Sequence, residues 1–123
     1  LNVANRVAGF VNANSLFQRV IPYCLDCKVD IEVYNRNRID LYNKLTELGF
    51  KCVKPVGAFY MFPQTPIEDD VAFCNAAKEF NLLLVPGSGF GCKGHMRLSY
   101  CVSHDTIVNS FPAFEKLAKK FIK

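Results

Sequence analysis

The chain has 123 residues, half of them hydrophobic, and its 15 Lys and Arg against 11 Asp and Glu give a net charge of +4. This length suits one compact domain, and the hydrophobic content excludes an intrinsically disordered chain. The positive charge forms no long basic run, which argues against nucleic-acid binding, and no apolar stretch is long enough to span a membrane. The lysines at 116–123 alternate with apolar residues, as on the exposed face of a helix.

Six cysteines are spread along the chain at positions 24, 27, 52, 74, 92 and 101. Cys24 and Cys27 form a C-x-x-C pair, which is compatible with redox or zinc chemistry. No second pair follows, and the two histidines lack the spacing of metal ligands. We therefore expect reduced, mostly buried thiols and no metal site. With no visible secretory signal, a cytoplasmic protein is predicted.

The first third of the chain predicts two helices. Apolar residues recur at helical spacing over residues 14–26, and Pro22 within this segment predicts a kink. Asp30 is the expected N-cap of a second helix, which ends at Leu48 before Gly49. Its apolar stripe is expected to hold Tyr34, Leu41, Leu45 and Leu48. Its polar face is expected to hold Asn35, Arg36, Asn37, Arg38 and Lys44.

The middle of the chain predicts two strands and a helix. Residues 50–53 are expected to form a short strand, and the run Ala-Phe-Tyr-Met-Phe at 58–62 a buried one. The segment Thr65-Pro66-Ile67-Glu68 has the pattern of a capping box, which predicts a helix from there to Phe80. The acidic residues at its start, Glu68, Asp69 and Asp70, favour the positive end of the helix.

The last third predicts two strands and a helix. Residues 82–85 are expected to be a strand buried on both faces, and 86–94 a loop with four glycines. Residues 96–102 alternate, with Met96, Leu98, Tyr100 and Val102 on one face and Arg97, Ser99 and Cys101 on the other. Ser103 is the expected cap of the last helix, which Pro112 should bend or split. This order predicts an α+β fold, a small mixed or antiparallel sheet of about three to four strands packed against helices.

Arg97 is the first candidate binding residue. By strand alternation it lies on the face opposite Met96 and Leu98, directly after the glycine-rich loop. A guanidinium offers a planar fork of N–H donors that matches a carboxylate with two hydrogen bonds. Sequence context leaves two alternatives open: Arg97 anchors an acidic small molecule, or it forms a surface ion pair with an acidic side chain.

The loop at 87–94 is a second candidate. Its backbone N–H groups could cradle a phosphate, but it lacks the lysine of a P-loop and runs into a strand. We therefore expect its glycines to let the backbone pass close to a ligand or partner. His95 and His104 are expected to be structural, because neither has an apparent Ser or Cys partner for acid–base work. We expect core positions for Phe59, Tyr60 and Phe62, and turn or cap positions for Asn12 and Asn14.

Three segments carry a family resemblance. They are Pro-Val-Gly-Ala-Phe-Tyr-Met-Phe-Pro at 55–63, Val-Pro-Gly-Ser-Gly-Phe-Gly at 85–91 and Gly-His-Met-Arg-Leu-Ser-Tyr at 94–100. In this order and spacing they resemble the C-terminal small domain of class I/II aminotransferases, fold-type I enzymes that depend on pyridoxal phosphate. The resemblance implies that Arg97 holds the substrate α-carboxylate and that Gly57 and Phe59 lie near the same cleft.

The resemblance also implies a division of the chain. Residues 1–28 would be a kinked helical segment continuing from a large domain, and residues 29–123 a small domain that closes over the substrate. The family's cofactor lysine lies in a Ser-x-Ser-Lys-like motif, which this sequence lacks. We therefore expect a fragment, inactive alone, with no catalytic or cofactor-binding residue of its own and with pyridoxal phosphate bound by the large domain.

The parent protein implied by the resemblance is a homodimer that acts on amino-acid and 2-oxo-acid substrates. Two other hypotheses remain open. One is a pyridoxal-phosphate-dependent β-elimination lyase of the cystathionine β-lyase type, which has the same fold and carboxylate arginine. The other is a non-enzymatic ligand-binding module whose arginine holds an acid.

Overall fold

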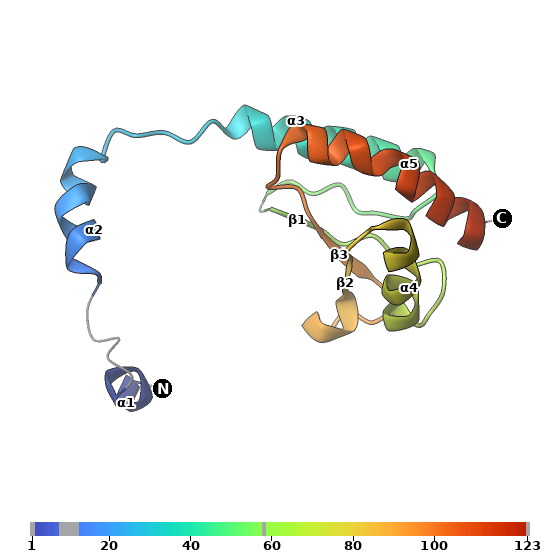
Figure 1. Ribbon diagram of the computed structural model, residues 1–123, viewed down its shortest axis with the longest axis horizontal. Coiled ribbons are helices and arrows are strands. Elements are labelled where there is room, and N and C mark those ends of the chain that lie inside the picture. Colours follow the sequence, from blue (N-terminus) through green and yellow to red (C-terminus); the bar gives the residue numbers. More distant parts are fainter. Residues whose placement is uncertain (1, 8–12, 58, 123) are drawn as a thin grey trace.

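The structure, a computed structural model, describes residues 2–7, 13–57 and 59–122. Figure 1 shows an α+β body that begins with helix α3 (Ile31–Glu47) and ends with helix α5 (His104–Phe121). An arm precedes the body and carries helices α1 (Asn2–Val7) and α2 (Ser15–Val20) away from it. The predicted α+β class is confirmed. The predicted turn residue Asn12, and Ala58 in the predicted strand 58–62, lie outside the described residues.

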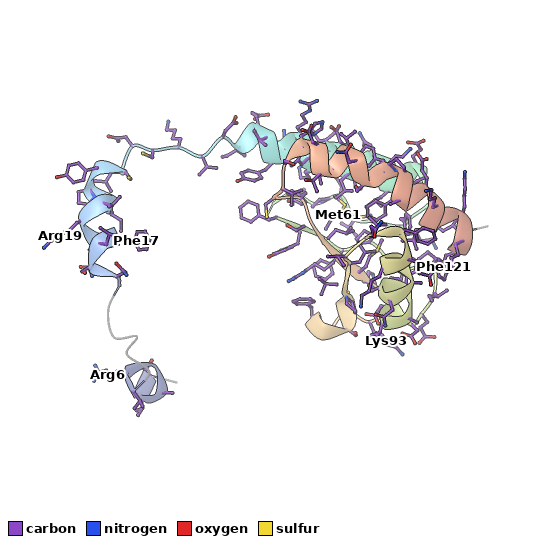
Figure 2. All side chains as sticks on the ribbon, in the orientation of Figure 1. Arg6, Phe17, Arg19, Met61, Lys93 and Phe121 are labelled. Carbon is purple, nitrogen blue, oxygen red and sulfur yellow. The ribbon has the colours of Figure 1, made fainter. Side chains whose placement is uncertain are left out.

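The arm contains the first predicted helix in a shortened form. Asn14 caps α2, as predicted, by accepting a hydrogen bond from the backbone N–H of Leu16 at 2.9 Å. The α-helix ends at Val20 instead of continuing to 26, and a 3-10 turn, η1 (Ile21–Tyr23), follows. Pro22 lies in this turn, where its missing N–H costs no α-helical hydrogen bond. Figure 2 shows Phe17 and Arg19 on this helix, apart from the body.

Helix α3 confirms its predicted ends. Asp30 accepts a hydrogen bond from the N–H of Glu32 at 3.0 Å, and Gly49 follows the last turn with φ +89°. This left-handed conformation favours glycine, which explains why the helix stops there. Leu41 and Leu45 are buried, as the apolar stripe predicts.

Asn37 corrects the predicted polar face of α3, because its side chain is fully buried. The chain segment after the last strand crosses α3 at this point, and its carbonyl groups need hydrogen-bond donors. The Asn37 amide supplies them, donating to the carbonyls of Tyr100 at 3.0 Å and Val102 at 2.7 Å. A buried polar side chain is stable here because its donors are satisfied.

The sheet has three strands in the order β1-β3-β2, with both pairs antiparallel. They are β1 (Tyr60–Met61), β2 (Val85–Pro86) and β3 (Met96–Ser99). Tyr60 pairs with Ser99, and Val85 pairs with Arg97. The predicted alternation holds along β3, because Met96, Leu98 and Tyr100 are buried. Val102 departs from it and is partly exposed, since the strand ends at Ser99 and the chain leaves the sheet.

Three strand predictions need correction. Residues 50–53 form no strand: Phe50 enters the core, and the carbonyl of Lys51 accepts one hydrogen bond from the N–H of Gln64 at 2.8 Å. The predicted strand 58–62 shortens to β1. The segment 82–85 is buried on one side only, since Leu83 is 85% exposed. Both observed strands, β1 and β2, lie at the edges of the sheet and pair with β3 alone.

Helix α4 (Asp70–Ala77) starts later than the capping box at Thr65 predicts. Asp69 is the N-cap and accepts a hydrogen bond from the N–H of Ala72 at 2.9 Å. The Thr65 hydroxyl instead donates to the carbonyl of Ile67 at 2.7 Å, which closes a local turn. Asp69 prevails as the cap because an acidic group also complements the positive end of the helix. A 3-10 turn, η2 (Lys78–Phe80), then ends this segment where predicted.

Helix α5 runs through Pro112 without splitting, contrary to one of the predicted outcomes. Ser103 caps it as predicted, accepting a hydrogen bond from the N–H of Thr106 at 3.2 Å. Proline frees the carbonyl four residues earlier, at Val108. Pro112 and Val108 are both exposed, so water can satisfy that carbonyl and the helix survives.

The core lies between the sheet and the helices, with α3 and α5 packed side by side (Figure 1). Phe50 contacts Phe73 and Phe114 edge to face. Figure 2 places Met61 and Phe121 within this body. The buried apolar side chains include Leu45, Phe73, Met96 and Leu117. This single core joins the helices of the body, and no described residue of the arm belongs to it.

The cysteines do not match the prediction of mostly buried thiols. All six lie in described segments and are free, and Cys74 alone is buried. Cys24 and Cys27 are exposed because they belong to the arm, and Cys101 because it follows the outward-facing positions of β3.

Among the described helices, none is long and apolar enough to cross a membrane. The described residues also contain no cluster of His, Cys, Asp and Glu suited to a metal ion.

Candidate functional site

Arg97 lies between two aromatic side chains on the outer face of the sheet. Its guanidinium carbon is 4.4 Å from the centroid of the Tyr60 ring and 4.1 Å from that of the Phe90 ring. Tyr60 reaches it from β1. Tyr60 pairs with Ser99 of β3, and Ser99 faces outward on the same side of β3 as Arg97. Phe90 comes from the 3-10 turn η3 (Gly87–Phe90), which follows β2. The cation is thus held by cation–π contacts.

Arg97 has no anionic partner within the described part of the chain. None of the ion pairs there includes it, and no described group accepts a hydrogen bond from its side chain. Of the two alternatives that the sequence leaves open, the surface ion pair is therefore not the one observed. The in-plane N–H donors of the guanidinium remain available to a carboxylate.

The turn η3 is held by the chain's own backbone and by one carboxylate. The N–H of Gly87 donates to the carbonyl of His95 at 2.8 Å, and the N–H of Cys92 donates to the carbonyl of Gly87 at 3.0 Å. A Cβ atom at Gly87 would lie 2.3 Å from the Cys92 carbonyl oxygen. The glycine is therefore required by close approach of the chain to itself, whereas the sequence predicted close approach to a ligand or partner.

The phosphate-cradle alternative for this loop does not fit its hydrogen bonds. The N–H of Ser88 donates to the Asp70 carboxylate at 2.6 Å, and this bond holds the pKa of Asp70 below its usual range. A negative side chain that already occupies the donor opposes a phosphate. No described lysine lines the pocket near Gly57 or contacts the rings at Arg97. Neither the loop at η3 nor the pocket near Gly57 therefore offers a lysine or free phosphate-binding donors to pyridoxal phosphate, the cofactor that the resemblance implies.

Gly57 and Phe59 lie together, at a pocket of about 320 Å³ beside the start of α3. The Tyr34 ring meets the Phe59 ring edge to face, with centroids 5.5 Å apart. Arg38 closes the pocket by donating to the carbonyl of Pro55 at 2.7 Å. The residues that line it are Ile31, Glu32, Tyr34, Asn35, Arg38, Val56, Gly57, Phe59 and Tyr100. The structure thus brings Gly57 and Phe59 to one pocket, whose lining does not include Arg97.

The aromatic side chains in and beside β1 are less buried than predicted. Tyr60 is 44% exposed, Phe59 is also exposed, and Phe62 is half-buried against Phe90 with ring centroids 6.0 Å apart. An edge strand leaves these rings uncovered, which frees Tyr60 to contact Arg97. Sequence reasoning assigned Tyr60 to the core and treated Phe90 only as part of the glycine-rich loop. The signal in the sequence for a contact with Arg97 was Phe90, an aromatic residue between two glycines that shortly precedes the strand of Arg97.

The two histidines are in structural positions, as predicted. A ring nitrogen of His95, Nδ1, lies 3.1 Å from the Lys93 carbonyl oxygen. The corresponding nitrogen of His104 lies 3.1 Å from Oδ1 of the buried Asn37, and its Nε2 lies 3.7 Å from the Asp40 carboxylate. His95 thus contacts the backbone beside it, and His104 contacts two side chains of α3.

Comparison with known proteins places the chain among aminotransferases. The family model described as "Aminotransferase class I and II" matches residues 13–110. An aspartate aminotransferase from Geobacillus stearothermophilus is 43% identical over 76 residues, covering 54% of this chain and 19% of that protein.

Solved structures agree with this match. A crystal structure of an aminotransferase from Eubacterium rectale superposes with a TM-score of 0.86 and 49% identity, covering 98% of this chain and 30% of that one. An aspartate aminotransferase from Thermus thermophilus, solved with maleate, gives a TM-score of 0.67 and 36% identity, covering 70% and 23%. The chain spans less than a third of the length of these relatives.

Proposed function

Because this chain belongs to the class I and II aminotransferase family, we propose that it is part of an enzyme that moves an amino group between an amino acid and a 2-oxo acid. The observation that carries the proposal is Arg97. Its guanidinium is held by two rings and has no anionic partner among the described residues. A guanidinium in this state is ready to bind the carboxylate that every amino acid and 2-oxo acid carries.

Arg97 is proposed to hold the substrate α-carboxylate through a bidentate pair. The Thermus thermophilus relative, solved with maleate, is a protein in complex with a dicarboxylate, which supports carboxylate binding in the family. The outward position of Arg97 on β3 leaves its donors facing away from the core. Closure of this domain over a substrate would then exclude water from the ion pair and strengthen it.

Gly57 and Phe59 are proposed to border the substrate. Gly57 has no left-handed backbone, and a Cβ atom there would meet nothing within 4 Å in the described residues. Neither backbone strain nor packing within the chain therefore requires a glycine at this position. Gly57 lines the pocket beside the start of α3, and its missing side chain leaves room there for a group that approaches from outside the chain, which supports a binding role.

The cofactor of this reaction is proposed to be pyridoxal phosphate, which acts as an electron sink when bound. Neither η3 nor the pocket at Gly57 offers it a lysine, so we propose that other parts of a longer protein hold it and that these 123 residues alone are inactive. With pyridoxal phosphate and borohydride, the chain should acquire no stoichiometric adduct. One cofactor fixed on a single lysine would contradict this.

We also propose that the parent protein is a cytoplasmic homodimer. Residues 1–28 would pack on the rest of that protein, and residues 29–123 would form the domain that closes over the substrate. Support comes from the arm, whose described helix α2 has no buried side chain. Leu16, Phe17, Val20 and Ile21 are all exposed there. An apolar row of this kind is stable in water only when another surface covers it.

The test is Arg97→Ala in the full-length protein. Loss of a bidentate charged pair should lower kcat/KM roughly 10- to 150-fold, or about 1.5–3 kcal/mol. Arg97→Lys keeps the charge but not the fork, and should recover only part of the loss. Arg36→Ala is the matched control, because Arg36 forms only an exposed pair with Asp40 at 3.9 Å. Wild-type kinetics for Arg97→Ala would overturn the assignment.

Product analysis separates this reaction from its alternatives. A new amino acid formed from a 2-oxo acid supports the aminotransferase. Ammonia and pyruvate released from a sulfur amino acid would instead identify a β-elimination lyase. No turnover of amino acids by the full-length protein would favour a ligand-binding module.

A further inference from the structure

We propose that Tyr60 and Phe90 are positioning residues that hold the Arg97 guanidinium in the orientation needed to bind a carboxylate. This inference rests on the proposed function. It adds to it a pair of side chains that act through Arg97 and need not touch the substrate themselves.

The first argument is the kind of contact. Both rings lie within 4.4 Å of the guanidinium carbon, the short end of the range for a cation–π contact. An aspartate or glutamate in their place would neutralise Arg97 and occupy its N–H donors. Aromatic faces attract the cation but accept no hydrogen bond in its plane. The rings thus stabilise the side chain and leave the fork available to a ligand.

The second argument is that separate elements hold the two rings. Tyr60, in β1, is fixed by its pairing with Ser99 in β3. Phe90 is fixed by η3, in which the N–H of Ser88 binds the buried Asp70 carboxylate and Gly87 packs against the Cys92 carbonyl. Because β1 flanks β3 on one side and β2, which leads into η3, flanks it on the other, the position of the guanidinium is set from two sides.

The third argument is exposure. Tyr60 is 44% exposed and Phe90 is 49% exposed, so neither ring is needed to fill the core. Large aromatic side chains on a surface that retain a specific contact with a cation are better explained by that contact than by burial. Pre-ordering the flexible arginine lowers the entropy lost when a carboxylate binds.

The experiment uses the full-length holoenzyme with Tyr60→Leu and Phe90→Leu, which remove the π faces and keep apolar side chains. Each should raise the KM for the amino acid and the Kd for maleate roughly 3- to 10-fold, with kcat little changed. Tyr60→Phe and Phe90→Tyr keep the faces and should stay within about twofold of wild type. Phe80→Leu is the matched control, since it removes a ring whose cation–π partner is a different residue, Lys120, at 5.7 Å from the ring centroid.

The Arg97→Ala background decides whether the rings act through Arg97. There, the two leucine substitutions should have no further effect on KM or on maleate binding. Wild-type values for both leucine variants, or equal losses with and without Arg97, would overturn this inference alone. Wild-type kinetics of Arg97→Ala itself would instead overturn the proposed function and this inference with it. Either ring suffices for the test if one variant fails to fold.

Discussion

The amide of Asn37 on α3 donates a hydrogen bond to the carbonyl oxygen of Tyr100 at 3.0 Å. The same nitrogen donates to the Val102 carbonyl at 2.7 Å, and Oδ1 of Asn37 faces His104 at the start of α5. One buried side chain therefore ties α3, the end of β3 and α5 together. Because Arg97 lies on the same strand, this junction also fixes the strand that carries the candidate binding residue.

We expect Asn37→Leu to destabilise the chain by about 1–3 kcal/mol, because it leaves the buried Tyr100 carbonyl without a donor. Asn43→Leu is the control, since Asn43 is exposed on the same helix and should change stability by less than about 0.5 kcal/mol. Urea denaturation of both variants measures the difference. Equal midpoints for the two would show that the junction contributes little.

Gly87→Ala should destabilise the chain by roughly 1–3 kcal/mol, because the new methyl group overpacks against the Cys92 and His95 carbonyls. Gly89→Ala changes the same turn but meets nothing within 4 Å, so it should be close to neutral. Thermal unfolding followed by circular dichroism compares them. A Gly87→Ala variant as stable as Gly89→Ala would contradict the close approach seen at η3.

Asp70 should make stability depend on pH. Hydrogen bonding from the Ser88 N–H is the largest cause that lowers the pKa of Asp70 in the folded chain. Because the pKa of Asp70 is lower in the folded chain than in the unfolded one, its ionisation stabilises the fold. This stabilisation is complete at a pH above the unfolded pKa, which is about 4 for aspartate, and it is lost as the pH falls through the folded pKa. Wild type should therefore exceed Asp70→Asn in Tm at pH 6.

The difference in Tm between wild type and Asp70→Asn should shrink as the pH is lowered toward 3. The asparagine keeps an oxygen that can accept from Ser88 but carries no charge, so it isolates the ionisation of Asp70. A Tm difference that stays constant over this range would show that the hydrogen bond from the Ser88 N–H does not stabilise the ionised form of Asp70.

Replacing a phenylalanine by alanine should lower the free energy of unfolding far more in the body than in the arm. Phe73 is 0% exposed and packs edge to face on Phe50 and Phe121, so Phe73→Ala should cost about 3–5 kcal/mol. Phe17 is 64% exposed on α2, and Phe17→Ala should cost less than about 0.5 kcal/mol in this chain. Denaturant unfolding provides both numbers. A comparable loss for Phe17→Ala would mean that α2 packs on the body in solution.

Local chemistry was enough to place many of the element ends. Asp30 and Ser103 were identified as caps from sequence because a side-chain oxygen satisfies free N–H groups wherever a helix starts. The capping box at Thr65 failed because Asp69 offered a competing cap a few residues later. The strand at 50–53 failed because a strand needs a partner ladder, and no local pattern supplies one. The burial of Asn37 was missed because its partners lie more than sixty residues away.

Sequence by itself determined the α+β class, the outward position of Arg97 on its strand and the family resemblance, because alternation, capping and short motifs depend on neighbouring residues. Tertiary structure alone decided what surrounds Arg97. Tyr60 and Phe90 meet it only because the order β1-β3-β2 brings both edge strands to β3. It also brought Gly57 and Phe59 to one pocket with Tyr34 and Arg38 of α3, because long-range packing, which local residues do not encode, places α3 against that segment.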